Sequence, residues 1–476
     1  MTASKAERTV IPAEEATGPF TRAERYEAGR TIRKRVPRTS HGDWKPAADR
    51  PDPIALLERQ NEQRLPELVP IRMGRMAATP FAFLRGSATV MAHDLAASPV
   101  SGIPVQASGD SHVMNFGLFG TQERNLVFGM NDFDETHPGP WEWDVKRMAA
   151  SAVVAARHLG GGDSVGADAA ASALRAYRAK MAEFAAMGNL QLWYTYLSVD
   201  EVMAAVTPEV AKRAQSIVTS ARSRTNLQVF AKMTELVDDD FRIIATPPLV
   251  TRVDPGPGGR TIETILQEWL NGYRSTLASD RRNLLDKYRL VDAVRKVVGV
   301  GSVGTRCFVI LLRGEDENDP LFLQVKEAPP SVLEPFTGRG NHANNGKRVV
   351  EGQRLLQPAP DIFLGWGSLA NAEGRVIDYY VRQLRDMKGG VTIEPGLMRP
   401  AGLIQYAGLC GWALALAHAR SGDASMISGY LGKSDVFDQA IARFALAYAD
   451  QTERDHAALE AAIKSGRVEA QGDGGN

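Results

Sequence analysis

Apolar residues recur at helical spacing through residues 145–290, in segments such as VKRMAASAVVAARHL and ADAAASALRAYRAKMAEFAAM. Because an amphipathic helix turns the same face to the core every three or four residues, this block is predicted to be mainly helical. The pattern changes over residues 294–327, where short β-branched runs are separated by the glycine-rich GVGSVGT and the acidic turn GEDENDP. Such runs between turn residues predict strands joined by tight connections.

The remaining patterns complete an α+β organisation. Helical spacing follows at NGKRVVEGQRLLQ, strand patterns at DIFLGWGS and VIDYYVRQL, and helical spacing again from about residue 401. Residues 1–50 are polar and basic and predict a partly flexible arm, whereas the last residues, SGRVEAQGDGGN, predict a disordered tail. The predicted parts are the arm at 1–50, a mainly helical part at 51–290, a small β-rich part at 291–385, C-terminal helices at 386–464 and a tail at 465–476.

The composition removes several classes of function. The 476 residues include 56 Lys and Arg against 56 Asp and Glu, so the chain lacks the positive field of a generic nucleic-acid or anionic-membrane binder. Cys307 and Cys410 are the only cysteines, which excludes a disulfide framework and a four-thiolate metal site. The N-terminus lacks the apolar core of a signal peptide, and the apolar stretch LCGWALALAHA is too short to span a bilayer. A cytoplasmic protein without membrane contact is expected.

The chemistry of the chain is concentrated in GDSHVMNFG and in NDFDE, which follows an apolar, strand-like run. Asp110 and Asn115 form a D-x-x-x-x-N arrangement, and Asp132 lies in the second segment. Transfer of a nucleotide phosphoryl group needs a carboxylate to orient and deprotonate the acceptor, and oxygen ligands for Mg²⁺. Asp and Asn also favour turn-capping positions. Capping explains each residue alone but not the three together.

These two segments resemble the catalytic segment of the protein-kinase-like superfamily, in its aminoglycoside phosphotransferase and choline kinase branch. The resemblance implies that Asp110 is the catalytic aspartate and His112 the histidine of its loop, although a structural role suits a histidine equally well. It implies further that Asn115, Asp132 and Asp134, the second acid of the DFD element, bind the metal and that Asp144 is a structural aspartate. The chain departs from the pattern at Ser108, where this branch usually has a histidine.

A kinase-like site also needs a phosphate cover and a lysine–glutamate pair, and these follow the catalytic loop instead of preceding it. The glycine-rich turn offers Gly299, Gly301, Ser302, Val303 and Gly304, whose amides would cover the phosphates. Lys326 on the next strand would bind the α- and β-phosphates and pair with Glu351 on the next helix, with VIDYYVRQL as the hinge strand. The internal order therefore predicts a two-lobed kinase-like fold that is circularly permuted. The alternative interpretation is purely structural. In that case the glycine-rich turn would be only a tight hairpin turn, and Lys326 and Glu351 would form a surface ion pair.

Three further features accompany these motifs. HARSGD, at 418–423, ends an apolar helix and partly copies the catalytic loop, so it is expected to pack beside that loop, with His418 and Asp423 structural or lining the acceptor side. HGDW, at 41–44, has no asparagine at the matching distance, so it is interpreted as a chance likeness to the catalytic loop. Arg72, Arg75 and Arg85 lie close together in the sequence. They would bind phosphate or, more commonly, form salt bridges with neighbouring acids. Arg85 is expected to have a structural role around the site.

The whole chain also resembles the DUF2252 family of bacterial proteins. The hallmarks are HGDW, RPDP, PELVPIRMGRM, FLRG, GDSHVMNFG, NDFDETHPGPWEWDVKR, VGSVGT, YYVRQLRDMKG and AHARSGD, spread over most of residues 40–455. This resemblance implies a shared fold and names no substrate.

Together the motifs predict an enzyme that binds ATP with Mg²⁺ or Mn²⁺ and transfers a phosphoryl group to a small-molecule or protein hydroxyl. AMP transfer by the same fold and a nucleotide-binding pseudoenzyme are the alternatives. A metallophosphoesterase is a further alternative, because DSH at 110–112 and GNH at 340–342 imitate its elements, but other metal ligands of that class are missing.

Overall fold

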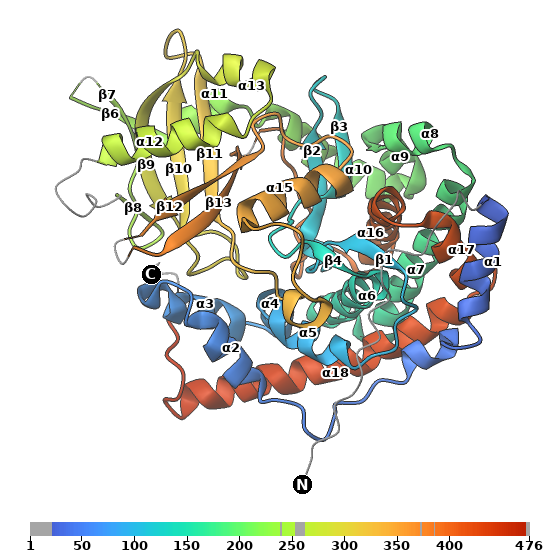
Figure 1. Ribbon diagram of the computed structural model, residues 1–476. Coiled ribbons are helices and arrows are strands. Elements are labelled where there is room, and N and C mark those ends of the chain that lie inside the picture. Colours follow the sequence, from blue (N-terminus) through green and yellow to red (C-terminus); the bar gives the residue numbers. More distant parts are fainter. Residues whose placement is uncertain (1–20, 239, 253–261, 372–373, 385, 473–476) are drawn as a thin grey trace.

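The computed structural model describes residues 21–238, 240–252, 262–371, 374–384 and 386–472. The chain has an α+β fold in which a six-stranded antiparallel sheet lies beside a larger helix-rich body (Figure 1). In spatial order the sheet contains β12 (Gly365–Ala370), β13 (Val376–Gln383), β11 (Pro320–Glu327), β10 (Cys307–Arg313), β9 (Arg289–Lys296) and β8 (Val250–Arg252). The acidic turn joins β10 to β11 with Arg313 opposite Pro320, so the predicted hairpin is confirmed.

The two faces of the sheet follow the alternation of side chains along β11. Leu321, Leu323 and Val325 pack in one apolar cluster with Trp269 and Tyr273 of α12 (Ile262–Ser275). The alternate positions face the other way: Phe322 packs below α11 (Asn226–Met233), whereas Gln324 and Lys326 point toward the helix-rich body. Neighbouring residues of a strand point to opposite faces of the sheet. The polar side chains of Gln324 and Lys326 therefore lie on the face opposite Leu321, Leu323 and Val325.

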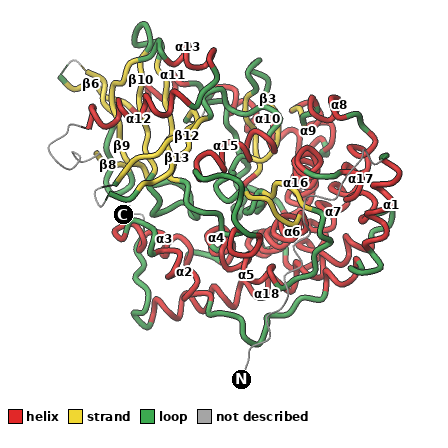
Figure 2. Tube along the Cα trace, viewed as in Figure 1, coloured by secondary structure: helices red, strands yellow, loops and turns green. Residues whose placement is uncertain are grey.

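The helix-rich body combines segments from both halves of the chain. It is built around α6 (Trp141–His158), α7 (Gly162–Ala186), α16 (Pro400–Ser421), α17 (Ala424–Leu431) and α18 (Val436–Lys464), which share one apolar core. Gly411 shows how closely these helices pack, because a Cβ atom there would collide with the carbonyl group of Ala173 on α7. The C-terminal helices therefore complete a core that begins some 250 residues earlier, as Figure 2 shows for α16 beside α6 and α7.

Smaller elements surround these two parts. The N-terminal region contains α1 (Arg22–Ile32), η1 (Arg38–Gly42), α2 (Pro53–Asn61), η2 (Pro66–Leu68), α3 (Val69–Ala77), α4 (Pro80–Gly86), α5 (Ala88–Ala96), β1 (Pro104–Ala107), η3 (Val113–Asn115), β2 (Phe116–Gly120), β3 (Leu126–Met130) and β4 (His137–Pro140). Then follow α8 (Asn189–Tyr194), β5 (Leu197–Ser198), α9 (Val199–Ala205), α10 (Pro208–Ser223), β6 (Thr234–Val237), β7 (Asp240–Ile243), α13 (Ser279–Leu285), α14 (Glu334–Thr337) and α15 (Asn345–Leu356). β1 pairs with β4, β2 with β3, β3 with β5, and β6 with β7.

The structure corrects several sequence-based boundaries. Residues 145–290 are mainly helical, as predicted, but β5 to β8 also lie within them, and α12 packs on the sheet instead of the helix-rich body. Residues 21–50 form α1 and η1, and α1 lies so close to α17 that Gly29 admits no Cβ beside Met426. The tail prediction is wrong for 465–472, because Val468 is buried and the Gln471 amide donates to Pro70 at 2.9 Å. Residues 1–20 and 473–476 lie outside the described ranges.

The apolar stretch before HARSGD belongs to a longer helix than the sequence indicated. α16 has 22 residues, which is long and apolar enough by composition to cross a membrane, so the sequence-based argument from length was wrong. Within the fold, 61% of its most apolar window is buried. Packing against α7 and α6 accounts for that apolar character.

Candidate functional site

The loop that follows β1 is held in place by a glycine of its own and by a carboxylate of α6. Gly109 has φ of +78°, and a Cβ atom there would collide with the backbone of Glu135, so glycine is required. The amides of Ser108 and Gly109 donate to the carboxylate of Asp144, at 2.6 and 3.0 Å, from the first turn of α6. Asp144 thus anchors the loop, and Asp110 is the first residue beyond the anchor.

The C-terminal near-copy packs directly against this anchor. His418 Nε2 lies 3.1 Å from Asp144 Oδ2, and Tyr177 Oη lies 2.8 Å from His418 Nδ1. All three side chains are buried. Asp423 instead caps α17, accepting the Met426 amide at 2.9 Å. The expectation that HARSGD packs beside the loop is confirmed, and His418 is the residue that makes the contact.

Asp110 lies in a network that leaves one carboxylate oxygen toward the cavity. Its Oδ1 accepts a hydrogen bond from Arg147 Nε at 2.5 Å, and its Oδ2 lies 3.9 Å from His112 Nε2. His112 Nδ1 accepts the Met114 amide at 3.2 Å, so the proton of its neutral ring is on Nε2, facing Asp110. Burial lowers the pKa of His112, and burial raises the pKa of Asp110 to about 6 against the opposing charge of Arg147.

Asn115 completes this loop at the end of η3. Its side-chain Nδ2 donates to the backbone oxygen of Asp110 at 2.7 Å. This contact uses the amide nitrogen and turns the amide oxygen away from Asp110. The D-x-x-x-x-N spacing therefore has a structural reason, since the two residues close one turn of backbone between them.

The acidic segment after β3 meets the sheet. Asp134 Oδ2 accepts hydrogen bonds from Lys326 Nζ at 2.6 Å and Ser302 Oγ at 3.2 Å, and its Oδ1 accepts one from Tyr380 Oη at 2.6 Å. Burial alone would raise the pKa of Asp134, but the ammonium group of Lys326 holds it below its ordinary value. For Asp132, burial and the neighbouring charge of Asp134 both raise the pKa.

The predicted pairing of Lys326 with Glu351 is wrong. Lys326 is engaged by Asp134, whereas the Glu351 carboxylate lies 3.6 Å from Lys347 and 3.5 Å from His342, with 42% of its side chain exposed. The residue of α15 that reaches the acidic segment is Arg348, which donates to backbone oxygens of Thr136 and Asp134. Lys326 pairs with Asp134 because the side chain of Lys326 points to the face of the sheet on which the Asp134 carboxylate lies.

These segments enclose a cavity of about 420 Å³, within the size range of ligand sites. Its lining includes the predicted residues Asp110, His112, Asn115, Asp132, Asp134, Arg85, Gly299, Gly301 and Ser302. Val303 and Gly304 do not line it: Val303 is buried in an apolar cluster, and the Gly304 carbonyl accepts the Leu65 amide at 2.8 Å. The structure therefore brings most of the predicted site together from three separate regions of the chain.

Sequence reasoning missed four charged residues of the cavity, one of which is Arg59 on α2. Glu135 and Glu327 line it, and so does Arg64, whose guanidinium group donates to the Val303 carbonyl at 2.5 Å. Burial raises the pKa of Glu135 to about 7, although its carboxylate accepts the Val332 amide. The third acid of NDFDE was a usable signal for Glu135. No sequence signal pointed to Arg64, which is 239 residues from its partner.

The oxygen donors fit a hard cation better than a soft one. Asp132 offers a partly buried carboxylate whose only hydrogen bond among the described residues is a long one, 3.4 Å from the Asp134 amide, and Asn115 offers its amide oxygen. In the described part of the chain no group of three or more His, Cys, Asp or Glu has the arrangement of a complete metal site. Two protein oxygens with further ligands from phosphate and water is the binding pattern of Mg²⁺.

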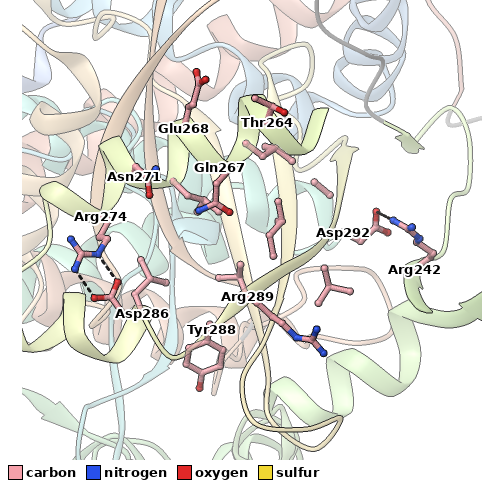
Figure 3. A pocket seen from close by; sticks show the side chains of 17 residues that line it. Arg242, Thr264, Gln267, Glu268, Asn271, Arg274, Asp286, Tyr288, Arg289 and Asp292 are labelled. Carbon is pink, nitrogen blue, oxygen red and sulfur yellow. Dashed lines mark hydrogen bonds and ion pairs between the residues drawn. The ribbon is translucent and has the colours of Figure 1, made fainter. Parts of the chain in front are cut away.

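The HGDW motif and a second groove lie elsewhere. His41 of HGDW lies 2.7 Å from Tyr430 Oη and is buried in the helix-rich body. A groove of about 790 Å³ runs along α12 and β9, on the face of the sheet that turns away from Lys326. Figure 3 shows Arg274 facing Asp286 there, and Arg242 facing Asp292. These charges pair with one another, and the groove contains none of the predicted site residues.

The fold and the site together define an α+β protein with an acidic, glycine-covered cavity between a sheet and a helical core. The chain belongs to the DUF2252 family, described as an uncharacterized protein conserved in bacteria, whose model matches residues 64–462. No curated protein and no solved structure matches the chain.

Proposed function

We propose that this chain is an ATP- and Mg²⁺-dependent phosphotransferase with a two-lobed, circularly permuted kinase-like fold. The observation that carries the proposal is the contact between Lys326 and Asp134, which are 192 residues apart. It joins the strand lysine, which is buried behind the cavity wall, to Asp134, which lines the cavity together with Asp110 and part of the glycine-rich loop. If the acidic residues only capped turns, no contact between Asp134 and Lys326 would be required.

The succession of elements supports the fold. β9, the glycine-rich turn, β10, β11 with Lys326, α15, β12 and β13 follow one another in the order expected of a kinase-like small lobe. The loop with Asp110 and Asn115 and the segment with Asp132 precede this block, and α16, which packs beside the loop, follows it. The permuted arrangement therefore accounts for the near-copy at 418–423 as the neighbour of the loop.

The glycine-rich turn supplies the phosphate cover. Gly301 and Ser302 line the cavity and have backbone amides without an acceptor among the described residues, and Gly299 adopts a positive φ angle of +67°. Such turns present amides to anions. Ser302 donates to Asp134, which holds the turn over the acidic segment.

Asn115 and Asp132 would hold Mg²⁺, which when bound supplies neutralising charge for the phosphates of the nucleotide. The residues of the chain perform the remaining roles. Lys326, which is buried behind Asp134, holds that carboxylate ionised at the wall of the cavity. Arg147 and His112 orient Asp110 toward the cavity.

Asp110 is the proposed base. Its carboxylate accepts the proton of the acceptor hydroxyl, while a bond forms between the acceptor oxygen and the γ-phosphorus and the bond from that phosphorus to the bridging oxygen breaks, releasing ADP. A pKa of about 6 keeps the carboxylate mostly ionised at neutral pH and still basic enough to take a proton.

Substitution of Asp132 tests the proposal. Asp132→Ala should abolish Mg²⁺-dependent ATP binding or turnover with an unchanged circular dichroism spectrum, because it removes a carboxylate metal ligand. Asp163→Ala is the matched control, since that aspartate is exposed and pairs with Arg157. Unaltered ATP consumption in Asp132→Ala would overturn the assignment.

Measurements on the wild-type protein with labelled ATP and with phosphate esters distinguish the alternative functions. Transfer of label from γ-labelled ATP identifies phosphoryl transfer, and transfer from α-labelled ATP identifies AMP transfer. Binding without either product identifies a pseudoenzyme. Mn²⁺-dependent ester hydrolysis without ATP identifies a metallophosphoesterase.

A further inference from the structure

Three arginines of the N-terminal region line the cavity. They are Arg59 on α2, Arg64 after α2 and Arg85 near the end of α4. Among the residues that the structure describes, none of the three forms an ion pair. Arg64 donates only to the carbonyl of Val303, and the guanidinium carbon of Arg85 lies 6.0 Å from the ring centre of Phe81. The cavity thus contains positive groups for which the fold supplies no counter-ion in contact.

Three of the five carboxylates that line the cavity are paired with other cations, whereas Asp132 and Glu135 form no ion pair among the described residues. The contacts are Asp110 with Arg147 at 2.5 Å, Asp134 with Lys326 at 2.6 Å and Glu327 with Arg306 at 3.2 Å. Acids nearby act on Arg64 and Arg85 only through space, whereas Arg59 is exposed to solvent. A charge that is partly buried without a hydrogen-bonded counter-ion is unfavourable unless a ligand provides one.

Arg85 is placed beside Asp110 by a specific set of contacts. Arg147 donates through Nε to Asp110 and through one terminal nitrogen to the carbonyl of Leu84 at 2.9 Å. The residue after Leu84 is Arg85, so the same guanidinium group fixes the proposed base and the start of the Arg85 side chain. Arg85 Nε is itself buried and has no hydrogen-bond partner in the described part of the chain.

The wall that carries these arginines also limits the size of the acceptor. Leu57 of α2 and Met76 of α3 pack with Leu459 of α18 in one apolar cluster, which joins this wall to the helix-rich body. The cavity of about 420 Å³ has to hold the reacting end of a nucleotide as well as the acceptor. A folded protein surface does not fit in such a space, whereas a small molecule does.

Resting on the proposed function, we propose that the acceptor is a small hydroxyl compound that carries a phosphate group, bound by Arg59, Arg64 and Arg85. Arginine matches the oxygens of a phosphate with paired N–H donors. A phosphate dianion has three terminal oxygens and suits three guanidinium groups better than a single carboxylate does. A cationic acceptor, such as choline, would be repelled by this wall.

Calorimetric titration tests this binding site. The cavity is first saturated with Mg²⁺ and a non-hydrolysable ATP analogue, which fills the γ-phosphate position, and inorganic phosphate is then titrated as the probe. Arg85→Gln should weaken phosphate binding about 10- to 100-fold, the value of one charge-assisted contact, and leave the affinity for the analogue unchanged. Arg85→Lys should give an intermediate loss, because it keeps the charge and loses the paired donors.

The matched control is Arg467→Gln, which removes one positive charge from the outer side of α2, where Arg467 pairs with Asp52 and Glu58. It should bind phosphate as the wild type does. Equal loss of phosphate and analogue affinity in Arg85→Gln would overturn the inference, because the arginine would then serve the nucleotide. Acetate or choline binding in place of phosphate would overturn it as well. Failure of the wild type to bind the analogue counts against the proposed function instead, and phosphate titrated alone into the same variants still tests the arginine site.

Discussion

Two segments of this chain share the letters Ser-Gly-Asp, at 108–110 and at 421–423, and the fold uses them differently. Gly109 has φ of +78° and leads Asp110 into the cavity, whereas Gly422 is extended, with φ of −132°, and leads Asp423 to the start of α17. The segments lie side by side through His418 and Asp144. The same tripeptide therefore leads into the cavity of the proposed site in one place and to the start of a helix in the other, and the surrounding backbone decides which.

The largest expected effect separates the two aspartates. Asp110→Asn should reduce phosphoryl transfer by about 10²- to 10⁴-fold, because the amide cannot take the acceptor proton. Asp423→Asn should leave the rate unchanged, since asparagine caps a helix as well as aspartate does. The measurement is turnover of ATP with Mg²⁺, with thermal unfolding to verify that both variants fold. Equal rates in the two variants would remove the distinction between the segments.

A second expected effect concerns the lysine of the sheet. Lys326→Met leaves the partly buried Asp134 without its counter-ion, so it should lower the free energy of unfolding by about 1 to 3 kcal/mol and abolish turnover. Glu351→Gln should change neither, because Glu351 contacts Lys347 and His342 at the surface. Chemical unfolding and ATP turnover of both variants provide the measurement. A loss in Glu351→Gln as large as that in Lys326→Met would restore the pairing that the sequence suggested.

A third expected effect tests the support provided by the C-terminal copy. His418→Ala removes the partner of Asp144 and Tyr177 inside the core, which should cost about 1 to 3 kcal/mol of stability. The rate should fall less than in Asp110→Asn, because Asp144 still binds the amides of Ser108 and Gly109. His418→Asn should recover part of the rate, since a side-chain amide can still donate to Asp144. A variant with full stability and no activity would instead place His418 in the chemistry.

The sequence was sufficient wherever a feature depends on neighbours along the chain. The β10–β11 hairpin, the helix over Asn345–Leu356 and the D-x-x-x-x-N turn each follow from local periodicity and turn residues. Partners that are far apart in the sequence were not accessible in this way. Lys326 meets Asp134 instead of Glu351, and Arg147 holds Asp110, because sheet register and helix packing bring them together. The strands β6 to β8 were missed because a short strand between helical segments carries little periodicity.

The smallest expected effect concerns His41, in the third motif of this kind, HGDW. Burial, followed by the charge of Lys146, lowers the pKa of His41 from its ordinary value of about 6.5 to about 3. Between these two values the unfolded chain binds a proton that the folded chain does not, so this residue makes stability fall as the pH falls below about 6.5. One such group changes the free energy of unfolding by at most about 1.4 kcal/mol per pH unit.

His41→Gln should therefore reduce the slope of stability against pH between 6.5 and 5 relative to the wild type, measured by urea unfolding. Other buried histidines, including His112, contribute equally to both proteins, so the difference between the two slopes isolates His41. Turnover at pH 7.5 should be unchanged, because His41 lies against Tyr430 and Phe437 and not in the cavity. Identical slopes would show that His41 is hydrated, whereas a loss of turnover would connect this third copy to the site and break the division between chemistry and support.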